Sequence, residues 1–167
     1  MIADDITFKP AWRRDDPEII AGAKRLWAQM GIPEQLTAHR EKELCATAYR
    51  GDEIAAVATA EIFHFPQMRN KFFAYRCLVS PQFRKKNLSW QITAYSFELL
   101  HEWCKQNAQE KILGFLLVIE TDKFAVPQRK PVRENLGMTL NFVGYTPEGH
   151  QMRVIWFDDA ELEGAVI

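Results

Sequence analysis

Residues 72–90 read FFAYRCLVSPQFRKKNLSW, and the apolar pattern of a long helix follows as far as Cys104. The aromatic and β-branched run Phe72–Val79 predicts a strand. Apolar side chains then recur at steps of three and four from Leu88 to Trp103, which predicts a helix that packs on a sheet. A strand, a basic turn and a helix joined in this order present backbone N–H groups and the positive end of a helix dipole at one point. This arrangement favours phosphate binding.

The composition is that of a soluble globular protein. The chain has 167 residues, of which 47% are hydrophobic and 26% are charged, and this length predicts one domain over residues 1–167. The net charge is -1, so an anion-binding surface has to be local. A general nucleic-acid-binding protein would be more basic.

Cysteine usage and the N-terminus bear on the compartment. The three cysteines, Cys45, Cys77 and Cys104, lack metal-ligand spacing and favour neither a disulfide framework nor a zinc site. Asp4 and Asp5 stand where a secretory leader would be basic, and no stretch reaches the ~20 apolar residues of a membrane helix. We therefore expect a cytoplasmic protein that does not contact a membrane.

The first half of the chain predicts a strand, two helices and a hairpin. Pro17 follows Asp16, a favoured helix cap, and Gly31 stands at the expected C-terminal cap. The apolar period then changes to two on either side of the turn at residues 50–52. The predicted strand covers residues 6–11, the helices residues 17–30 and about 33 or 37 to 44, and the hairpin residues 45–65.

The second half predicts a buried strand and a final pair of strands. Residues 112–119 are almost all apolar, as in a central strand that a helical crossover makes parallel to the strand before it. Prolines at 127 and 131 predict an irregular loop, with at most a short helix over residues 131–138. Strands are expected at 140–146 and 151–157, followed by a frayed acidic tail. The element order is that of a mixed α+β sheet.

From residue 6 to residue 158 this order resembles the GNAT superfamily of N-acetyltransferases. In that family a strand ends in a hydrophobic residue, then come a Pro or polar pair, Arg or Gln, two variable residues, Gly, one variable residue, and Gly or Ala. Arg84 matches, whereas Asn87 stands at the first glycine position and Ser89 at the last position. Asn tolerates the left-handed conformation best among residues with a side chain, and Ser is nearly as small as Ala.

The resemblance implies a mostly antiparallel mixed sheet with a splayed pair of central parallel strands, flanked by helices. It implies acetyl-CoA as the acyl donor, without a metal. The pantetheine arm would pair with the strand edge, and a backbone N–H near Val79 would stabilise the oxyanion. Lysine side chains in the turn would add charge for the pyrophosphate. The implied binding residues are Leu78, Val79, Ser80, Arg84, Lys85, Lys86, Asn87, Leu88 and Ser89.

The catalytic side chains are harder to assign. Some family members carry a carboxylate base on the strand before the turn, but residues 72–79 contain no acid. Many carry a Tyr acid on a helix five residues ahead of a Gly-Phe pair; matching that pair to residues 141–142 places Gly137 at the Tyr position. We take Glu61 and Glu120 as candidate bases, with water as the alternative. Tyr145 is the candidate acid, and Tyr95 or Ser80 would be alternatives.

Three functional hypotheses follow. The first is transfer of an acyl group from CoA to a primary amine of a small molecule or peptide by direct attack. The second is a GNAT-like protein that binds CoA or an acyl carrier with weak turnover. The third, single-stranded nucleic-acid binding through aromatic strands, is disfavoured by the near-neutral charge. A homodimer remains open, and the sequence does not identify the acceptor.

Overall fold

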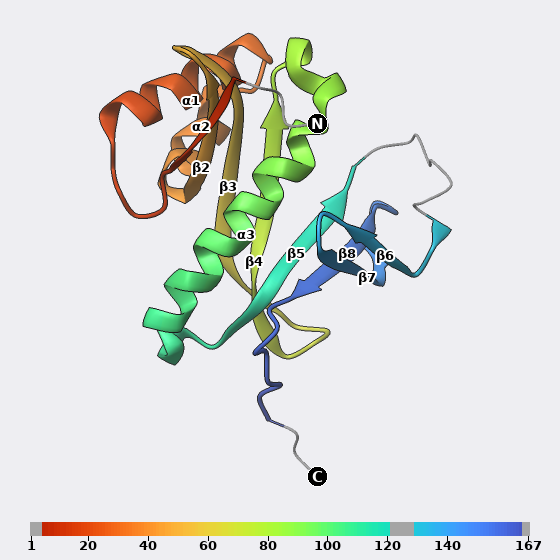
Figure 1. The fold of residues 1–167 in the computed structure, drawn as a ribbon. Coiled ribbons are helices and arrows are strands. Elements are labelled where there is room, and N and C mark those ends of the chain that lie inside the picture. The colour runs from red at the N-terminus through yellow and green to blue at the C-terminus, as the bar shows by residue number, and fades with distance from the viewer. Residues whose placement is uncertain (1–4, 121–128, 165–167) are drawn as a thin grey trace. The chain divides into compact units, whose positions relative to one another are not determined.

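A computed structural model describes residues 5–120 and 129–164 of the chain (Figure 1). Contacts between Cα atoms divide the chain into two compact units, which are described separately. The first unit comprises residues 1–60 and 76–100, and the second comprises residues 61–75 and 101–167. The single-domain assignment stays a prediction.

The first unit contains a sheet in the order β1-β2-β3-β4, which begins with antiparallel pairs. Its strands are β1 (Ile6–Pro10) and β2 (Leu44–Arg50), together with β3 (Glu53–Phe65) as far as Ala60 and β4 (Asn70–Val79) from Arg76 onward. The hairpin predicted at residues 45–65 is confirmed as β2 and β3.

Two predicted helices in this unit are confirmed. Helix α1 spans Pro17–Gln29, and the Asp16 carboxylate caps it by accepting hydrogen bonds from the backbone N–H groups of Glu18 and Ile19 at 3.0 and 3.4 Å. Helix α2 spans Glu34–Arg40 and continues as the 3-10 helix η1 (Glu41–Glu43). The apolar face of α1 packs on the sheet in a core of Ala11, Ile19, Ala23, Leu26, Trp27, Leu44, Tyr49, Ile54 and Val57.

A 3-10 helix, η2 (Pro81–Lys86), connects β4 to the long helix α3 (Leu88–Gln106). The buried face of α3 runs through Leu88, Ile92, Ser96 and Leu100, so it is rotated from the stripe that the apolar pattern predicted. Small polar residues occupy this face because their hydroxyls have local partners. The Thr93 hydroxyl donates to the Ser89 carbonyl at 2.7 Å.

The second unit contains strands in the order β3-β4-β5-β8-β7-β6 (Figure 1). β5 (Ile112–Ile119) is parallel to β4, as predicted, and follows the short 3-10 helix η3 (Ala108–Glu110). β5 pairs with β8 (Gln151–Trp156), and β8 pairs with β7 (Met138–Tyr145), both antiparallel. A Cβ at Gly114 would lie 2.0 Å from the Ile155 carbonyl oxygen, so the approach of β5 to β8 requires glycine there.

The short helix predicted over residues 131–138 is wrong. Residues 132–135 form strand β6 (Val132–Asn135), which pairs antiparallel with β7. Leu136 and Gly137 both have positive φ, 47° and 77°, as a two-residue type I′ hairpin turn requires. The sequence hid this turn because a leucine is strained at positive φ. Gly137 therefore lies in a turn, and no helix in the described part of the chain stands where the family resemblance placed its tyrosine.

The predicted frayed tail is wrong as far as residue 164. In the second unit, Nε2 of His101 lies 2.8 Å from an oxygen of Asp159, and the His101 ring stacks on Phe157 at 4.4 Å. The Glu163 backbone N–H donates to the Asn70 side chain at 3.0 Å, and its carboxylate pairs with Lys111. These contacts hold the segment after β8 against the rest of that unit.

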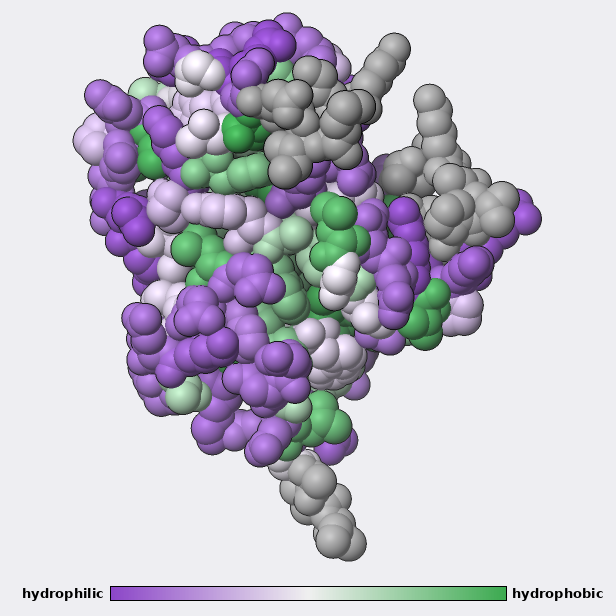
Figure 2. Space-filling view, viewed as in Figure 1, coloured by the Kyte–Doolittle hydropathy of each residue, from purple (hydrophilic) through white to green (hydrophobic). Residues whose placement is uncertain are grey.

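The visible face of the molecule is mostly hydrophilic, with hydrophobic areas among the hydrophilic ones (Figure 2). None of the helices in the described residues has both the length and the apolar character needed to cross a membrane.

Candidate functional site

The end of β4 supplies a strand edge. The parallel register between β4 and β5 runs from Lys71↔Ile112 to Ala74↔Leu116, whereas β4 continues to Val79. Within the described residues, positions 76–79 therefore have no registered partner on β5. Backbone groups along such an edge are able to pair with an extended ligand. Leu78 and Val79, two of the predicted binding residues, belong to this edge.

The turn after β4 has the backbone conformation that a glycine would have. Asn87 adopts φ 57° and ψ 20°, in the left-handed region, immediately before α3 begins at Leu88. Asn87 therefore adopts the left-handed conformation that asparagine tolerates best among residues with a side chain. The side chain of Asn87 is exposed. Ser80 begins the turn, and its carbonyl accepts a hydrogen bond from the Phe83 N–H at 2.9 Å.

Arg84, the matched motif residue, has a structural contact as well as an exposed position. Its Nε donates to the Val79 carbonyl oxygen at 3.3 Å, which ties the turn to the last residue of β4. Lys85 and Lys86 complete η2 and place two further cationic residues in the same turn.

The β2–β3 hairpin supports this turn from outside, a feature that the sequence analysis missed. Phe83 is 1% exposed, and the Arg50 guanidinium lies 4.7 Å from the centre of its ring. Glu53 accepts a hydrogen bond from the Gln82 side chain and pairs with Arg50 at 3.2 Å. We call Arg50, Glu53, Gln82 and Phe83 the hairpin brace. Its only sequence signal is Phe83, a lone aromatic residue in a basic turn.

The first turn of α3 faces the same connection. The backbone N–H of Gln91 donates a hydrogen bond to the Asn87 carbonyl oxygen at 3.2 Å. The N–H groups of Leu88 and Ser89 precede it and have no acceptor within the helix, as at every helix start. Together with the helix dipole, they favour an anion beside residues 87–89.

The catalytic candidates belong to three different strands or strand ends. Glu61 lies on β3, Glu120 follows β5, and both are exposed. Tyr145 ends β7 and is 61% exposed, and the centre of its ring lies 5.1 Å from the centre of the Phe142 ring. No hydrogen bond or ion pair joins the side chains of these three candidates to another described residue. Their catalytic roles stay predictions.

The alternative acids differ in exposure. Tyr95 is half-buried and stacks on Phe8 at 5.3 Å, and burial raises its pKa. Ser80 is 7% exposed. A raised tyrosine pKa keeps the phenol protonated at neutral pH, which suits an acid more than a base.

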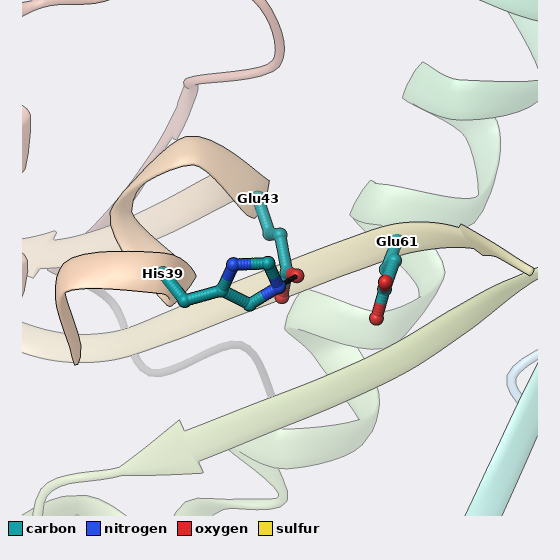
Figure 3. Close-up of side chains that lie close together, drawn as sticks. All are labelled: His39, Glu43 and Glu61. Atoms are coloured by element: carbon teal, nitrogen blue, oxygen red, sulfur yellow. Dashed lines mark ion pairs between the residues drawn. The ribbon is translucent and has the colours of Figure 1, made fainter. Parts of the chain in front are cut away.

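Two histidines have acidic partners. Nε2 of His39, on α2, lies 2.7 Å from an oxygen of Glu43, and Figure 3 shows these side chains pointing toward each other. Glu43 is buried, so the charged stretch at residues 39–43 is not exposed along its whole length. In the second unit, His101, Asp158 and Asp159 offer three ligand atoms within 4.8 Å of one another. Within this cluster, Nε2 of His101 lies 2.8 Å from the Asp159 carboxylate and 3.5 Å from that of Asp158.

Two of the three cysteines, Cys45 and Cys104, are poor nucleophiles at neutral pH. Burial raises the pKa of the Cys45 thiol to about 12, and burial followed by the nearby Asp159 raises that of Cys104 to about 12. A thiol is reactive as a thiolate, so both groups are inert near pH 7. Cys77 is half-buried, with its sulfur 3.9 Å from the Ser89 carbonyl oxygen.

No family model and no curated protein matches the chain. Among solved structures, it is similar to yncA of Salmonella typhimurium, described as a putative acetyltransferase with its cofactor acetyl-CoA. The TM-score is 0.54 at 13% identity, over 97% of this chain and 99% of that one. The ribosomal-protein-S18-alanine N-acetyltransferase of Escherichia coli matches with a TM-score of 0.47 at 12% identity, over 90% and 91% of the two chains.

An aminoglycoside 6'-N-acetyltransferase complexed with coenzyme A gives a TM-score of 0.49 at 14% identity, over 90% of this chain and 94% of that one. The resemblance noted in the sequence is confirmed at the level of the fold. The chain shares the fold of yncA, which here comprises a mixed sheet with the parallel β4–β5 pair.

Proposed function

We propose that the protein is an acyl-CoA-dependent N-acyltransferase that moves an acetyl group from acetyl-CoA to a primary amine. The observation that carries this proposal is the turn from Val79 to Ser89. A left-handed Asn87, a basic 3-10 helix and the start of α3 follow one another there, beside a strand edge. The similarity to a fold whose yncA representative was solved with acetyl-CoA supports the same assignment.

In this proposal the coenzyme lies along the chain's own backbone. Its pyrophosphate binds the N–H groups at the start of α3 and the cations of η2. Its pantetheine arm pairs with residues 78–80, which directs the thioester toward a backbone N–H near Val79. That N–H donates to the carbonyl oxygen as negative charge develops on it.

The transfer itself is a direct attack. The acceptor nitrogen forms a bond to the thioester carbon, the carbon–sulfur bond breaks, and the nitrogen gives up a proton. Glu61 or Glu120 accepts that proton, directly or through water, and Tyr145 donates one to the departing thiolate. Exposed carboxylates suit a proton path through water, because they are not desolvated.

Calorimetric titration with acetyl-CoA and with CoA tests the proposal. We expect binding of both, and weaker binding by several-fold when Lys86 in η2 is changed to Glu. Lys105→Glu, which reverses an exposed cation near the end of α3, is the matched control and should leave the affinity unchanged. A folded wild-type protein that binds neither ligand at millimolar concentration would overturn the proposal.

A second candidate is a protein that binds CoA or an acyl carrier with weak turnover. The observation that favours it is β6, a strand at the place where the family resemblance expects a helix with a catalytic tyrosine. Thiol release measured over a panel of amines separates the two candidates. Coenzyme binding without thiol release from any amine would favour the second.

A further inference from the structure

The first unit contains a cavity that the coenzyme proposal does not use. It has a volume of about 200 Å³ and lies between the loop from β1 to α1 and the short helix η1. Its walls combine apolar side chains with charges of both signs. They are formed by Ala11, Arg13, Arg14, Asp15, Asp16, Ile19, Ile20, Glu41, Lys42 and Leu44.

The loop that forms one wall has an unfavourable backbone conformation. Arg13 and Asp15 adopt φ of 57° and 48°, in the left-handed region that residues other than glycine rarely enter. Two such residues in one loop need support from the surrounding fold, and strained positions of this kind concentrate at ligand sites. The loop is anchored because the Ala11 and Trp12 N–H groups both donate to the Cys45 carbonyl, at 2.9 and 3.2 Å.

Half of the charges in the wall already have partners. Asp16 caps α1 through the N–H groups of Glu18 and Ile19, and Glu41 pairs with Lys24 at 2.7 Å. The Arg13 guanidinium lies 4.9 Å from the centre of the Trp12 ring.

The other three charged residues of the wall have no such partner among the described residues. Across residues 5–120 and 129–164, Arg14, Asp15 and Lys42 make no ion pair and no side-chain hydrogen bond. The cavity wall thus offers two cations and one carboxylate together with the buried side chains of Ile19 and Leu44.

We propose that this cavity binds a free aliphatic amino acid. The carboxylate of the ligand pairs with Arg14 and Lys42, its ammonium group with Asp15, and its aliphatic side chain contacts Ala11, Ile19 and Leu44. The cavity is smaller than the ~300–1,000 Å³ typical of pockets for drug-sized ligands, which suits a ligand of this size.

The site is separate from the proposed coenzyme turn. Leu44, in the cavity wall, begins β2, and Arg50, in the hairpin brace, ends it. Six residue steps along a strand span ~20 Å. Binding at the cavity therefore does not depend on acyl transfer, and either proposal is able to fail alone.

Calorimetric titration of the full chain with L-leucine and its two single-charge fragments tests this inference. 4-Methylpentanoate retains the carboxylate and 3-methylbutylamine retains the amine, so each loses one of the proposed ion pairs. We expect leucine to bind at least fivefold more tightly than either fragment. Equal binding of leucine and a fragment, or no leucine binding to the folded protein, would overturn the proposal.

Two variants assign the two ends of the ligand. Arg14→Gln should weaken the binding of leucine and of 4-methylpentanoate by at least threefold and leave the affinity for 3-methylbutylamine unchanged. Asp15→Asn should weaken the binding of leucine and of 3-methylbutylamine. Asparagine still tolerates the left-handed backbone at this position. Lys105→Gln, an exposed cation outside the cavity wall, is the control and should change none of the three. Variants that bind all three probes as the wild type does would reject the assignment.

Discussion

Asn87 offers the sharpest test of the turn that carries the proposed function. Its φ of 57° lies in a region that costs an ordinary L-residue ~1–2 kcal/mol. Because its side chain is exposed, substitutions remove little packing and act through the backbone. We expect Asn87→Ala to lower the free energy of unfolding by ~1 kcal/mol and Asn87→Val by ~2 kcal/mol, since valine is β-branched.

Asn87→Gly should stay within ~1 kcal/mol of the wild type. Glycine removes the strain at positive φ, but it also increases the conformational entropy of the unfolded chain. Urea unfolding measures the series, and a valine variant as stable as the wild type would refute the left-handed assignment.

The same series separates folding from coenzyme binding. In the native protein, a turn that leaves its left-handed conformation misplaces the N–H groups at the start of α3. An energy of ~1–2 kcal/mol corresponds to a factor of ~5–30 in an equilibrium constant. We therefore expect acetyl-CoA affinity to fall from the glycine variant to the valine variant by about that factor. Variants that lose stability yet bind acetyl-CoA as the wild type does would show that the turn does not hold the phosphates.

Three further predictions concern other parts of the fold. Phe83→Ala should lower the free energy of unfolding by ~3–5 kcal/mol in urea titrations because the ring is almost fully buried, and a loss below ~1 kcal/mol would contradict that burial. Asp159→Ala removes the 2.8 Å partner of His101 and should cost ~0.5–1.5 kcal/mol, more than Asp158→Ala, whose carboxylate lies 3.5 Å away; the opposite order would refute the pairing. Burial raises the pKa of Cys45 from 9.0 to about 12, so the stability from its neutral thiol is complete below pH 9 and is lost as pH rises toward 12. The stability difference between wild type and Cys45→Ala should therefore shrink over that interval, and a constant difference would contradict the shift.

Most of the order of helices and strands could be predicted from the sequence, because the period of the hydrophobic residues follows which side chains are buried. Residues 112–119 were expected as a buried strand and form β5 with those bounds. The cap at Asp16 and the glycine at 31 likewise located both ends of α1. The stripe on α3 was misplaced because Thr93 and Ser96 read as polar, although their hydroxyls are satisfied inside the core.

The site was less readable because its parts are distant in sequence. The sequence did indicate that Asn87 tolerates the left-handed conformation it adopts, because that tolerance is a property of a single residue type. The contact of Arg50 with Phe83 joins positions 33 residues apart and has no local signature. The cavity beside Arg14 depends on η1, and only the fold brings residues 41–44 to the loop before α1. The β6–β7 turn was not predicted either, because leucine disfavours the positive φ that Leu136 adopts. The pairing of β6 with β7 overrides that local preference.

The hairpin brace bears on how the proposed phosphate-binding turn would work with few glycines. A glycine-rich turn adopts positive φ without strain, so it needs little support from its surroundings. This chain instead fixes η2 at three points: Phe83 beneath Arg50, Gln82 on Glu53, and Arg84 on the Val79 carbonyl. Each contact restricts the turn before a ligand arrives, which lowers the conformational entropy lost on binding. The departure from the family motif at Asn87 and Ser89 is therefore compatible with a coenzyme site, because preorganisation by the β2–β3 hairpin replaces the conformational freedom of glycine.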